Sequence, residues 1–361
     1  MLAYVILFVL FAAAALKAGL NPAYAERRNL SVVAAALTLI IGLRREVGAD
    51  WNNYLSIFEH IRMLSIDKAM LRIEPAYGLL NWVAAKLGWS IWFVNLVCAG
   101  LFVWGLITFC RQQPSPAIAL LIALPYLIIG VGMGYTRQSA ALGLVLLALT
   151  QYTRGATLRM GISLVLAATF HNSSLVVAPL LAIAAAQRRV FTLGLIGFLG
   201  IVLLYQFSGH ILQRLQALNQ LNIQAGGASP RLAMNVVPAV IFLAIRKRFT
   251  VSPEELRLWT VFAGASLFTM VLLFVVPSTT IVDRLGIYLV PVQIFVLSRL
   301  PVVFGSRIRQ NMLVVSALIA YSGAVQFVWL TFGTWGHAWV PYNNYIWDNS
   351  EGEGLRGRRG G

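Results

Sequence analysis

Long apolar runs separated by short polar turns make up most of the chain. Runs such as 91–110, 257–276 and 311–332 carry almost no charge over roughly 20 residues, the length of helix that crosses the ~30 Å hydrocarbon core of a bilayer. Barrel strands would alternate over about 10 residues, and these runs do not. Helices are therefore expected, because lipid offers no partner to an open backbone. The pattern predicts an all-α, polytopic transmembrane bundle.

Apolar segments recur about twelve times. Their ranges are 2–20, 30–43, 91–110, 117–133, 138–153, 159–170, 173–187, 190–207, 231–246, 257–276, 285–299 and 311–332. The first segment lacks the basic start of a cleaved signal peptide, so it predicts a spanning helix. The short segments on either side of His171 predict two half-helices that meet inside protein or at water.

Residues 44–90 follow a different pattern. Apolar side chains recur at helical spacing at Trp51, Tyr54, Leu55, Phe58 and Ile61. This spacing predicts an amphipathic helix in the membrane interface, with Asp50 at its N-cap. A second interfacial helix is expected over 75–87, between Glu74 and Gly88.

Composition and charge agree with a membrane protein. The chain is 59% hydrophobic and 11% charged, whereas soluble domains average about 25% charged residues. The net charge of +16 would suggest nucleic-acid binding in a soluble protein. Here an N-terminus outside the cell places basic turns such as 246–248 on the inside, as the positive-inside rule requires, and no nucleic-acid partner is expected.

The chain is expected to form one membrane-embedded domain over residues 1–345. Residues 44–90 would be its outer interfacial loop. The Gly/Arg-rich tail 346–361 is expected to be disordered. The sequence Ser252-Pro253-Glu254-Glu255 predicts a capped helix start on the inner side.

Familiar catalytic motifs are missing from the sequence. It has no HExxH, P-loop, GxSxG or CxxC pattern, so no metal and no cofactor are expected. Candidate chemistry lies instead in polar residues near the outer ends of apolar segments, where ionisable groups are costly and point to function.

Arginines at these outer ends are candidates to bind phosphate. Arg44 and Arg45 follow the second apolar segment, and Arg137 with Gln138 begins the segment 138–153. A guanidinium can hold a phosphate through two hydrogen bonds. The alternative is that these side chains snorkel to lipid headgroups.

His171 is the candidate general base. An imidazole can accept a proton from an attacking hydroxyl near neutral pH. The alternative is a hydrogen-bonded histidine that packs two helices together. Asp50 and Glu74 are rival bases or sugar ligands, and Glu74 could instead be an N-cap.

Two further clusters complete the expected outer site. Asp283 and Arg284, with Tyr288 one turn on, could bind substrate or form a local ion pair. Trp339 and Tyr342 could stack on sugars or belong to the interfacial aromatic belt. A site on the outer side would thus combine arginines, carboxylates, one histidine and aromatic rings.

The order of these motifs resembles the EpsG/Wzy-type family of polysaccharide polymerases. The resemblance covers about residues 40 to 345. It rests on R-x-x-x-G-x-D-x-x-x-Y at Arg44–Tyr54, Glu74 with Tyr77, Arg137-Gln138, Phe170–Ser173, Asp283–Tyr288 and Trp339–Tyr342.

The resemblance implies a multi-pass glycosyltransferase of the bacterial plasma (inner) membrane with an outward-facing site. Its substrate would be an undecaprenyl-pyrophosphate-linked oligosaccharide, polymerised into exopolysaccharide or O-antigen. The activated leaving group removes the need for a nucleotide sugar. Membrane lipids, a chain-length regulator and a flippase would be its partners.

Two alternative functions remain open at this point. A lipid-oligosaccharide flippase would carry charged residues along a central cavity open to both sides. A membrane O-acyltransferase of the common bacterial kind would carry an Arg and a His in its first spanning segments, and residues 1–43 contain no His.

Overall fold

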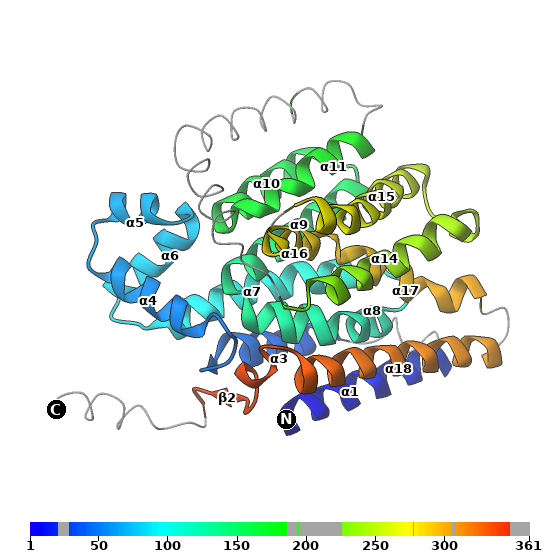
Figure 1. The fold of residues 1–361 in the computed structure, drawn as a ribbon, viewed down its shortest axis with the longest axis horizontal. Helices are drawn as coiled ribbons and strands as arrows, with labels where there is room; N and C mark the ends of the chain where they lie inside the picture. Colours follow the sequence, from blue (N-terminus) through cyan, green and yellow to red (C-terminus); the bar gives the residue numbers. More distant parts are fainter. Residues whose placement is uncertain (21–28, 186–193, 195–225, 277, 305–307, 347–361) are drawn as a thin grey trace.

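The structure is a computed structural model that describes residues 1–20, 29–185, 194, 226–276, 278–304 and 308–346. This part of the chain is a bundle of helices joined by short connections (Figure 1). The all-α fold expected from the sequence is confirmed. Apart from residue 194, the predicted segment 190–207 lies outside the described residues, as does the tail from residue 347.

The first half of the chain contains α1 (Leu2–Leu20), α3 (Leu30–Gly42), β1 (Arg44–Arg45), α4 (Trp51–Arg62), α5 (Ile66–Arg72), α6 (Pro75–Lys86), α7 (Ile91–Cys110), α8 (Pro116–Ala123), the π-helix η1 (Leu124–Gly132), α9 (Thr136–Thr153), α10 (Thr157–Phe170), η2 (Asn172–Val176) and α11 (Val177–Ala184). The second half contains α14 (Ala228–Ile245), η3 (Arg246–Arg248), α15 (Pro253–Val275), α16 (Thr279–Gly286), η4 (Ile287–Leu289), α17 (Pro291–Phe304), α18 (Ile308–Phe332), η5 (Gly336–Ala338) and β2 (Asn343–Asn344).

Five described helices are long and apolar enough to cross a membrane. They are α1, α7, α14 with η3, α15 and α18. A sixth span arises if the bent pair 279–289 and 291–304, with its 43° bend, is counted as one. The shorter apolar helices have 10–17 residues. The expectation of a multi-pass membrane protein is therefore confirmed.

Helix α9 lies at the centre of the bundle, packed against α7 (Figure 1). Two glycines permit the close approach of these helices. A Cβ on Gly105 would meet the backbone of Gly143, and a Cβ on Gly143 would meet the backbone of Leu101 and Phe102. Small residues allow helix backbones to approach within a membrane, where packing drives association. A larger side chain at either glycine would force α7 and α9 apart.

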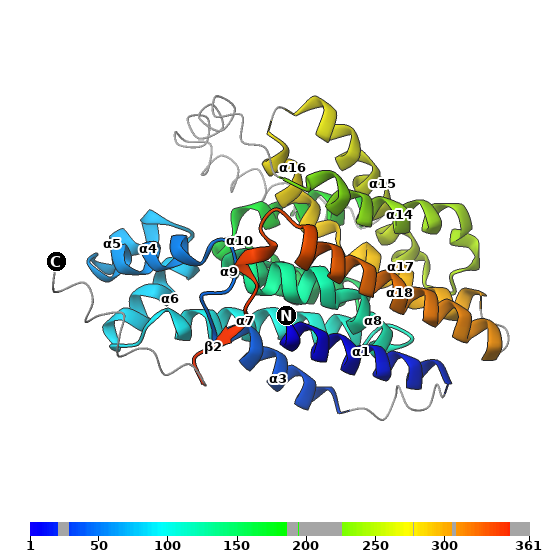
Figure 2. The same ribbon diagram turned by 60° about the horizontal axis from the view of Figure 1, so that its bottom comes forward.

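The predicted interfacial helices are present. Helices α4, α5 and α6 project together from one side of the bundle in both views (Figures 1 and 2). Helix α4 buries Trp51, Tyr54, Phe58 and Ile61, the apolar stripe expected from the sequence. Helix α6 ends before Gly88, whose φ of +73° is left-handed and favours glycine.

The end of the described chain packs back onto its beginning. The strands β1 and β2 pair antiparallel, with Arg44 opposite Asn344. Trp339 is 1% exposed, and its indole Nε1 donates to the Ile129 carbonyl of the π-helix at 2.9 Å. The Tyr342 hydroxyl donates to the Ile40 carbonyl at 2.7 Å. These contacts hold the C-terminal segment against α3 and η1.

The loop between β1 and α4 needs glycine at position 48. Gly48 has a φ of +104°, and a Cβ there would lie 2.6 Å from the Met133 carbonyl oxygen. Its amide donates to the Ala338 carbonyl at 2.8 Å. The glycine of the R-x-x-x-G-x-D pattern therefore lets this loop run close to the start of α9.

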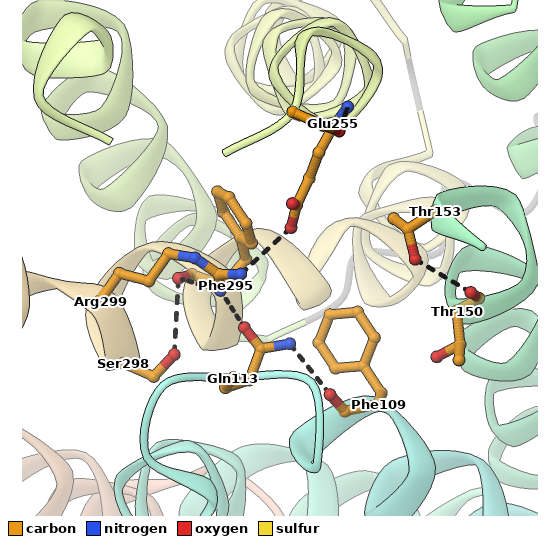
Figure 3. Close-up of polar contacts among 9 residues, drawn as sticks. Phe109, Gln113, Thr150, Thr153, Glu255, Phe295, Ser298 and Arg299 are labelled. Carbon is orange, nitrogen blue, oxygen red and sulfur yellow. Dashed lines mark hydrogen bonds and ion pairs between the residues drawn. The ribbon is translucent and has the colours of Figure 1, made fainter. Parts of the chain in front are cut away.

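A polar cluster lies near the C-terminal end of α9 (Figure 3). Arg299 of α17 donates to Glu255 Oε1 at 3.1 Å and to the Gln113 side chain, and it lies 3.9 Å from the Phe295 ring centroid. Gln113 in turn donates to the Phe109 carbonyl at 2.9 Å. The cluster joins the ends of α7, α15 and α17.

The predicted helix start at Ser252 is confirmed, with one difference. Ser252 Oγ accepts from the Glu255 amide at 3.1 Å. A capping box would turn the Glu255 carboxylate back to the Ser252 amide. Instead this carboxylate forms an ion pair with Arg299. A buried guanidinium without an anion costs more free energy than an exposed amide that can bond to water.

Arg299→Met should destabilise the protein by on the order of 3 kcal/mol, since it leaves the Glu255 carboxylate without its cation. The measurement is unfolding of the purified protein in mixed detergent, followed by tryptophan fluorescence. Arg248→Met, on an exposed arginine of η3, is the matched control and should change little. Adding Glu255→Gln to Arg299→Met should recover part of the loss. Equal stability of the Arg299 and Arg248 variants would contradict the assignment.

Candidate functional site

A buried carboxylate joins three separate elements at the N-terminal end of α9. Glu74 Oε2 accepts from Arg137 Nη1 at 2.6 Å, and Glu74 Oε1 lies 3.1 Å from His171 Nδ1. The Glu74 side chain is 9% exposed, that of His171 13% and that of Arg137 19%. These three residues, called the Glu74 cluster below, were separate candidates in the sequence, and the fold brings them together.

Local backbone structure explains why the side chains of Glu74 and His171 can contact each other. Glu74 occupies the N-cap position of α6, but its side chain does not cap the helix, so the N-cap alternative is not realised. His171 is extended, with φ −158° and ψ 119°, between the end of α10 and the start of η2. The predicted break between two short helices is therefore present, and it presents the imidazole to Glu74.

The surroundings of Glu74 keep it ionised. Burial raises the pKa of a carboxyl group, but the hydrogen bond from His171 and the charge of Arg137 outweigh burial and lower the pKa of Glu74 to about 2. Glu74 is therefore an anion at neutral pH. A carboxylate with so low a pKa orients other groups better than it accepts protons.

Two tyrosines surround the Arg137 guanidinium. Its central carbon lies 6.0 Å from the ring centroid of Tyr54 and 5.7 Å from that of Tyr77. The two rings meet edge to face at 6.2 Å. Rings at this distance attract a cation. Tyr54, a predicted substrate ligand, is 4% exposed and in this structure packs around Arg137.

Arg44 contacts Thr136, the residue before Arg137, and is 1% exposed. It donates to the Ile41 carbonyl at 2.7 Å and to Thr136 Oγ1 at 2.6 Å, and Thr136 donates to Asn95 Oδ1 at 3.1 Å. Within the described chain no carboxylate pairs with Arg44. Because Thr136 precedes Arg137, this network fixes the start of α9. The predicted role of Arg44 in contacting substrate does not fit its burial.

Helix α16 brings a second pair of predicted residues to the same region. Gln138 Nε2 donates to the Arg284 carbonyl at 2.9 Å, which joins α9 to α16. The Arg284 side chain is exposed, and no hydrogen bond or ion pair involves it within the described chain. Tyr288 is buried beside Gln138 and Ser173.

Asp283 does not pair with its neighbour Arg284. It forms two hydrogen bonds with Arg231 of α14, at 2.7 and 3.0 Å. The local ion pair that the sequence left open is therefore absent, because α16 turns the two side chains to different sides. Arg231 had no role in the sequence interpretation, although its position at the edge of an apolar segment was a usable signal.

Asp50 lies at the N-cap of α4 without capping it, and it is half-buried. Burial raises its pKa, and the charges of Arg284 and Arg137 oppose that effect without cancelling it. A carboxyl group with a raised pKa can exchange protons closer to neutral pH. Asp50 therefore remains a candidate acid or base at the edge of the Glu74 cluster.

Three predicted residues lie away from this cluster. Arg45 stacks 5.8 Å from the Tyr345 ring and approaches Glu46 at 3.9 Å. Trp339 is buried against η1, and Tyr342 bonds the end of α3. Phosphate binding by Arg45 and sugar binding by Trp339 and Tyr342 remain predictions, and the present contacts of these residues hold the C-terminal segment in place.

No group of three or more His, Cys, Asp or Glu side chains in the described part of the chain is arranged to hold a metal ion. The Glu74 cluster has instead one carboxylate, one arginine and one imidazole. Such a set suits proton transfer beside a bound anion.

The fold and site define a helical membrane protein with a buried carboxylate–arginine–histidine cluster. The sequence profile of the EpsG family matches residues 29–344, which covers most of the chain. The chain belongs to the EpsG family, and this membership supports a role of the polysaccharide polymerase type. No curated protein and no solved structure matches the chain.

Glu74→Gln should destabilise the protein near pH 7 by on the order of 3 kcal/mol, because its pKa falls from 4.5 to about 2 on folding and one pKa unit is worth about 1.4 kcal/mol. The contribution is present above pH 4.5 and is lost as the pH falls from 4.5 toward 2. The difference in unfolding free energy between wild type and Glu74→Gln should therefore shrink over that range.

Glu59→Gln is the matched control, since Glu59 forms an exposed pair with Arg62 on the neighbouring helix α4. Its effect should be small at every pH. A Glu74→Gln difference that stays constant between pH 5 and pH 2.5 would contradict the assignment of a buried, ionised carboxylate.

Proposed function

We propose that this protein polymerises oligosaccharide repeat units carried on a polyprenyl pyrophosphate, at the outer face of a bacterial plasma membrane. The product would be exopolysaccharide or O-antigen. The observation that carries the proposal is the Glu74 cluster, which holds an imidazole and an arginine on one buried carboxylate beside the exposed Arg284. Membership of the EpsG family supports a polymerase function.

In the proposed reaction a sugar hydroxyl of the incoming repeat unit attacks the anomeric carbon of the growing glycan. The new glycosidic bond forms as the bond from that carbon to the pyrophosphate oxygen breaks. The hydroxyl proton passes to His171, and the electron pair of the broken bond leaves on the lipid pyrophosphate. All atoms and charges balance without a nucleotide sugar.

Glu74 would give His171 the tautomer that this step needs. When His171 Nδ1 donates to Glu74 Oε1, the lone pair of the neutral ring lies on Nε2. The carboxylate also stabilises the imidazolium that forms when the proton arrives. This arrangement favours His171 over Glu74 as the base, and Asp50 remains the rival.

Arginines would stabilise the charge that grows on the pyrophosphate. Arg284 is exposed with an unengaged side chain in the described structure, and Arg137 keeps donors beyond the one that binds Glu74. Buried Nε of Arg137 has no partner among the described residues. Preorganised donors of this kind lower the barrier most when they face charge that develops in the transition state.

His171→Ala should keep the fold and reduce turnover by roughly 10²–10⁴-fold, the usual contribution of a general base. His171→Gln tests the role more sharply, because it keeps a polar group that can bond Glu74 and lacks basicity. The measurement is polymer formed per unit of folded membrane protein. Full polymerisation by the Gln variant would show that His171 has only a structural role, and Asp50 would then be the candidate base.

Arg137→Lys should lose most activity. Lysine keeps the charge but lacks the planar guanidinium, whose separate N–H groups can bind Glu74 and a phosphate at the same time. The measurement is polymer length and amount at equal membrane abundance. Arg62→Lys, on an exposed arginine of α4, is the control and should stay active. Normal polymer from Arg137→Lys would contradict a role in binding pyrophosphate.

Deleting the gene tests the function itself. The proposal predicts loss of long polysaccharide and accumulation of single repeat units on lipid at the outer face. Units that stay at the inner face would indicate a flippase instead. Chains of normal length that lack acyl groups would indicate an O-acyltransferase.

A further inference from the structure

An apolar cavity lies between α14, α18 and the π-helix η1. Its volume is about 440 Å³, within the ~300–1,000 Å³ range of ligand pockets. Met234 lines it from α14, Ala324 and Val328 line it from α18, and Tyr126 lines it from η1. Nearly all of this lining is hydrocarbon, so the cavity suits an apolar ligand.

The cavity opens toward the lipid-facing surface. Val328, in its wall, is 54% exposed, and Phe332, also in its wall, is 72% exposed. Both residues lie on α18, one of the helices long and apolar enough to cross a membrane. A hydrocarbon chain could therefore enter sideways from the bilayer without crossing water.

One wall of the cavity is charged. Arg231 lines it, lies 5.9 Å from the ring centroid of Trp329 and binds Asp283. The residue after Asp283 is the exposed Arg284, which lies outside the lining of the cavity and also interacts electrostatically with Asp50. An anionic head group at this wall would find the donors of Arg231, with the exposed guanidinium of Arg284 one residue beyond Asp283.

Tyr135 lies within electrostatic range of both this wall and Asp50. Its hydroxyl interacts with Arg231, Asp283, Asp50 and Arg284. Tyr135 also immediately precedes α9, whose second residue is Arg137 of the Glu74 cluster.

We propose that the cavity binds the part of a polyprenyl chain nearest the pyrophosphate of the donor lipid, with the pyrophosphate at Arg231 and Arg284. The inference rests on the proposed function and assigns a place to the lipid part of its substrate. A cavity of about 440 Å³ has room for a short part of such a chain. The remainder of a longer chain would lie in the bilayer.

The test uses farnesyl pyrophosphate, a short polyprenyl pyrophosphate, with the purified full-length chain in lipid nanodiscs. Ala324→Trp fills the cavity from α18. Leu313→Trp is the matched control, because it places the same side chain on the same helix at an exposed position outside the cavity. Ala324→Trp should weaken binding of farnesyl pyrophosphate by about tenfold or more, and Leu313→Trp should leave it unchanged. Equal affinity of the two variants would overturn the proposal.

Competition identifies the ligand class. Farnesol, which lacks the pyrophosphate, should bind at least about tenfold more weakly, and phosphatidic acid should displace the probe poorly. Displacement by phosphatidic acid at the same concentration as unlabelled farnesyl pyrophosphate would show a general lipid site and overturn the proposal. Equal binding of farnesol would overturn the placement of the pyrophosphate.

Cross-linking needs no variant and covers the case in which Ala324→Trp does not fold. A photoreactive farnesyl pyrophosphate should label wild-type peptides from α14, η1 or α18, and labelling confined to other helices would overturn the proposal. His171→Gln separates lipid binding from catalysis, since it should reduce polymerisation strongly and leave probe binding intact. Gene deletion separates this inference from the proposed function, because long polysaccharide that persists in the deletion strain counts against the function alone.

Discussion

Burying the charge of Glu74 is the constraint on which this site depends. An ionised carboxylate at 9% exposure is costly unless cations and donors surround it, and Arg137 and His171 supply them. The three residues come from the start of α6, the start of α9 and the break after α10. Satisfying one carboxylate therefore fixes the mutual position of three elements, and it sets the tautomer of the imidazole.

The rest of the bundle supports that arrangement. Gly105 and Gly143 allow α7 and α9 to pack closely, and Arg44 holds the start of α9 through Thr136. At the far end of α9, Arg299 ties α15 and α17 to the loop that carries Gln113 (Figure 3). Arginine contacts thus lie at both ends of α9, and α9 itself is almost wholly buried.

Much of the fold follows from the sequence because apolar length and turn chemistry are local signals. The spans such as α7 and α15, the amphipathic stripe of α4 and the end of α6 before Gly88 were all predicted. Helix α5 was not predicted, since seven residues carry little periodic signal. The π-helical form of η1 was also missed, because its apolar run fits any buried helix.

The site was less predictable, because its contacts join distant residues. The sequence identified Glu74, Arg137 and His171 as separate candidates. Arg137 lies 63 positions and His171 97 positions after Glu74, so no local pattern shows that both contact its carboxylate. Sequence also could not separate an exposed arginine, such as Arg284, from one buried as a support, such as Arg44. That difference depends on packing, which only the fold provides.

The central claim is that this chain transfers glycan from a lipid pyrophosphate. The most direct measurement is reconstitution of the purified protein in liposomes with one defined repeat unit on polyprenyl pyrophosphate, without nucleotide sugars. Chains of increasing length are expected, with one lipid pyrophosphate released for each glycosidic bond formed. Chain growth that requires an added nucleotide sugar, or no growth beyond one repeat unit from folded protein, would contradict it.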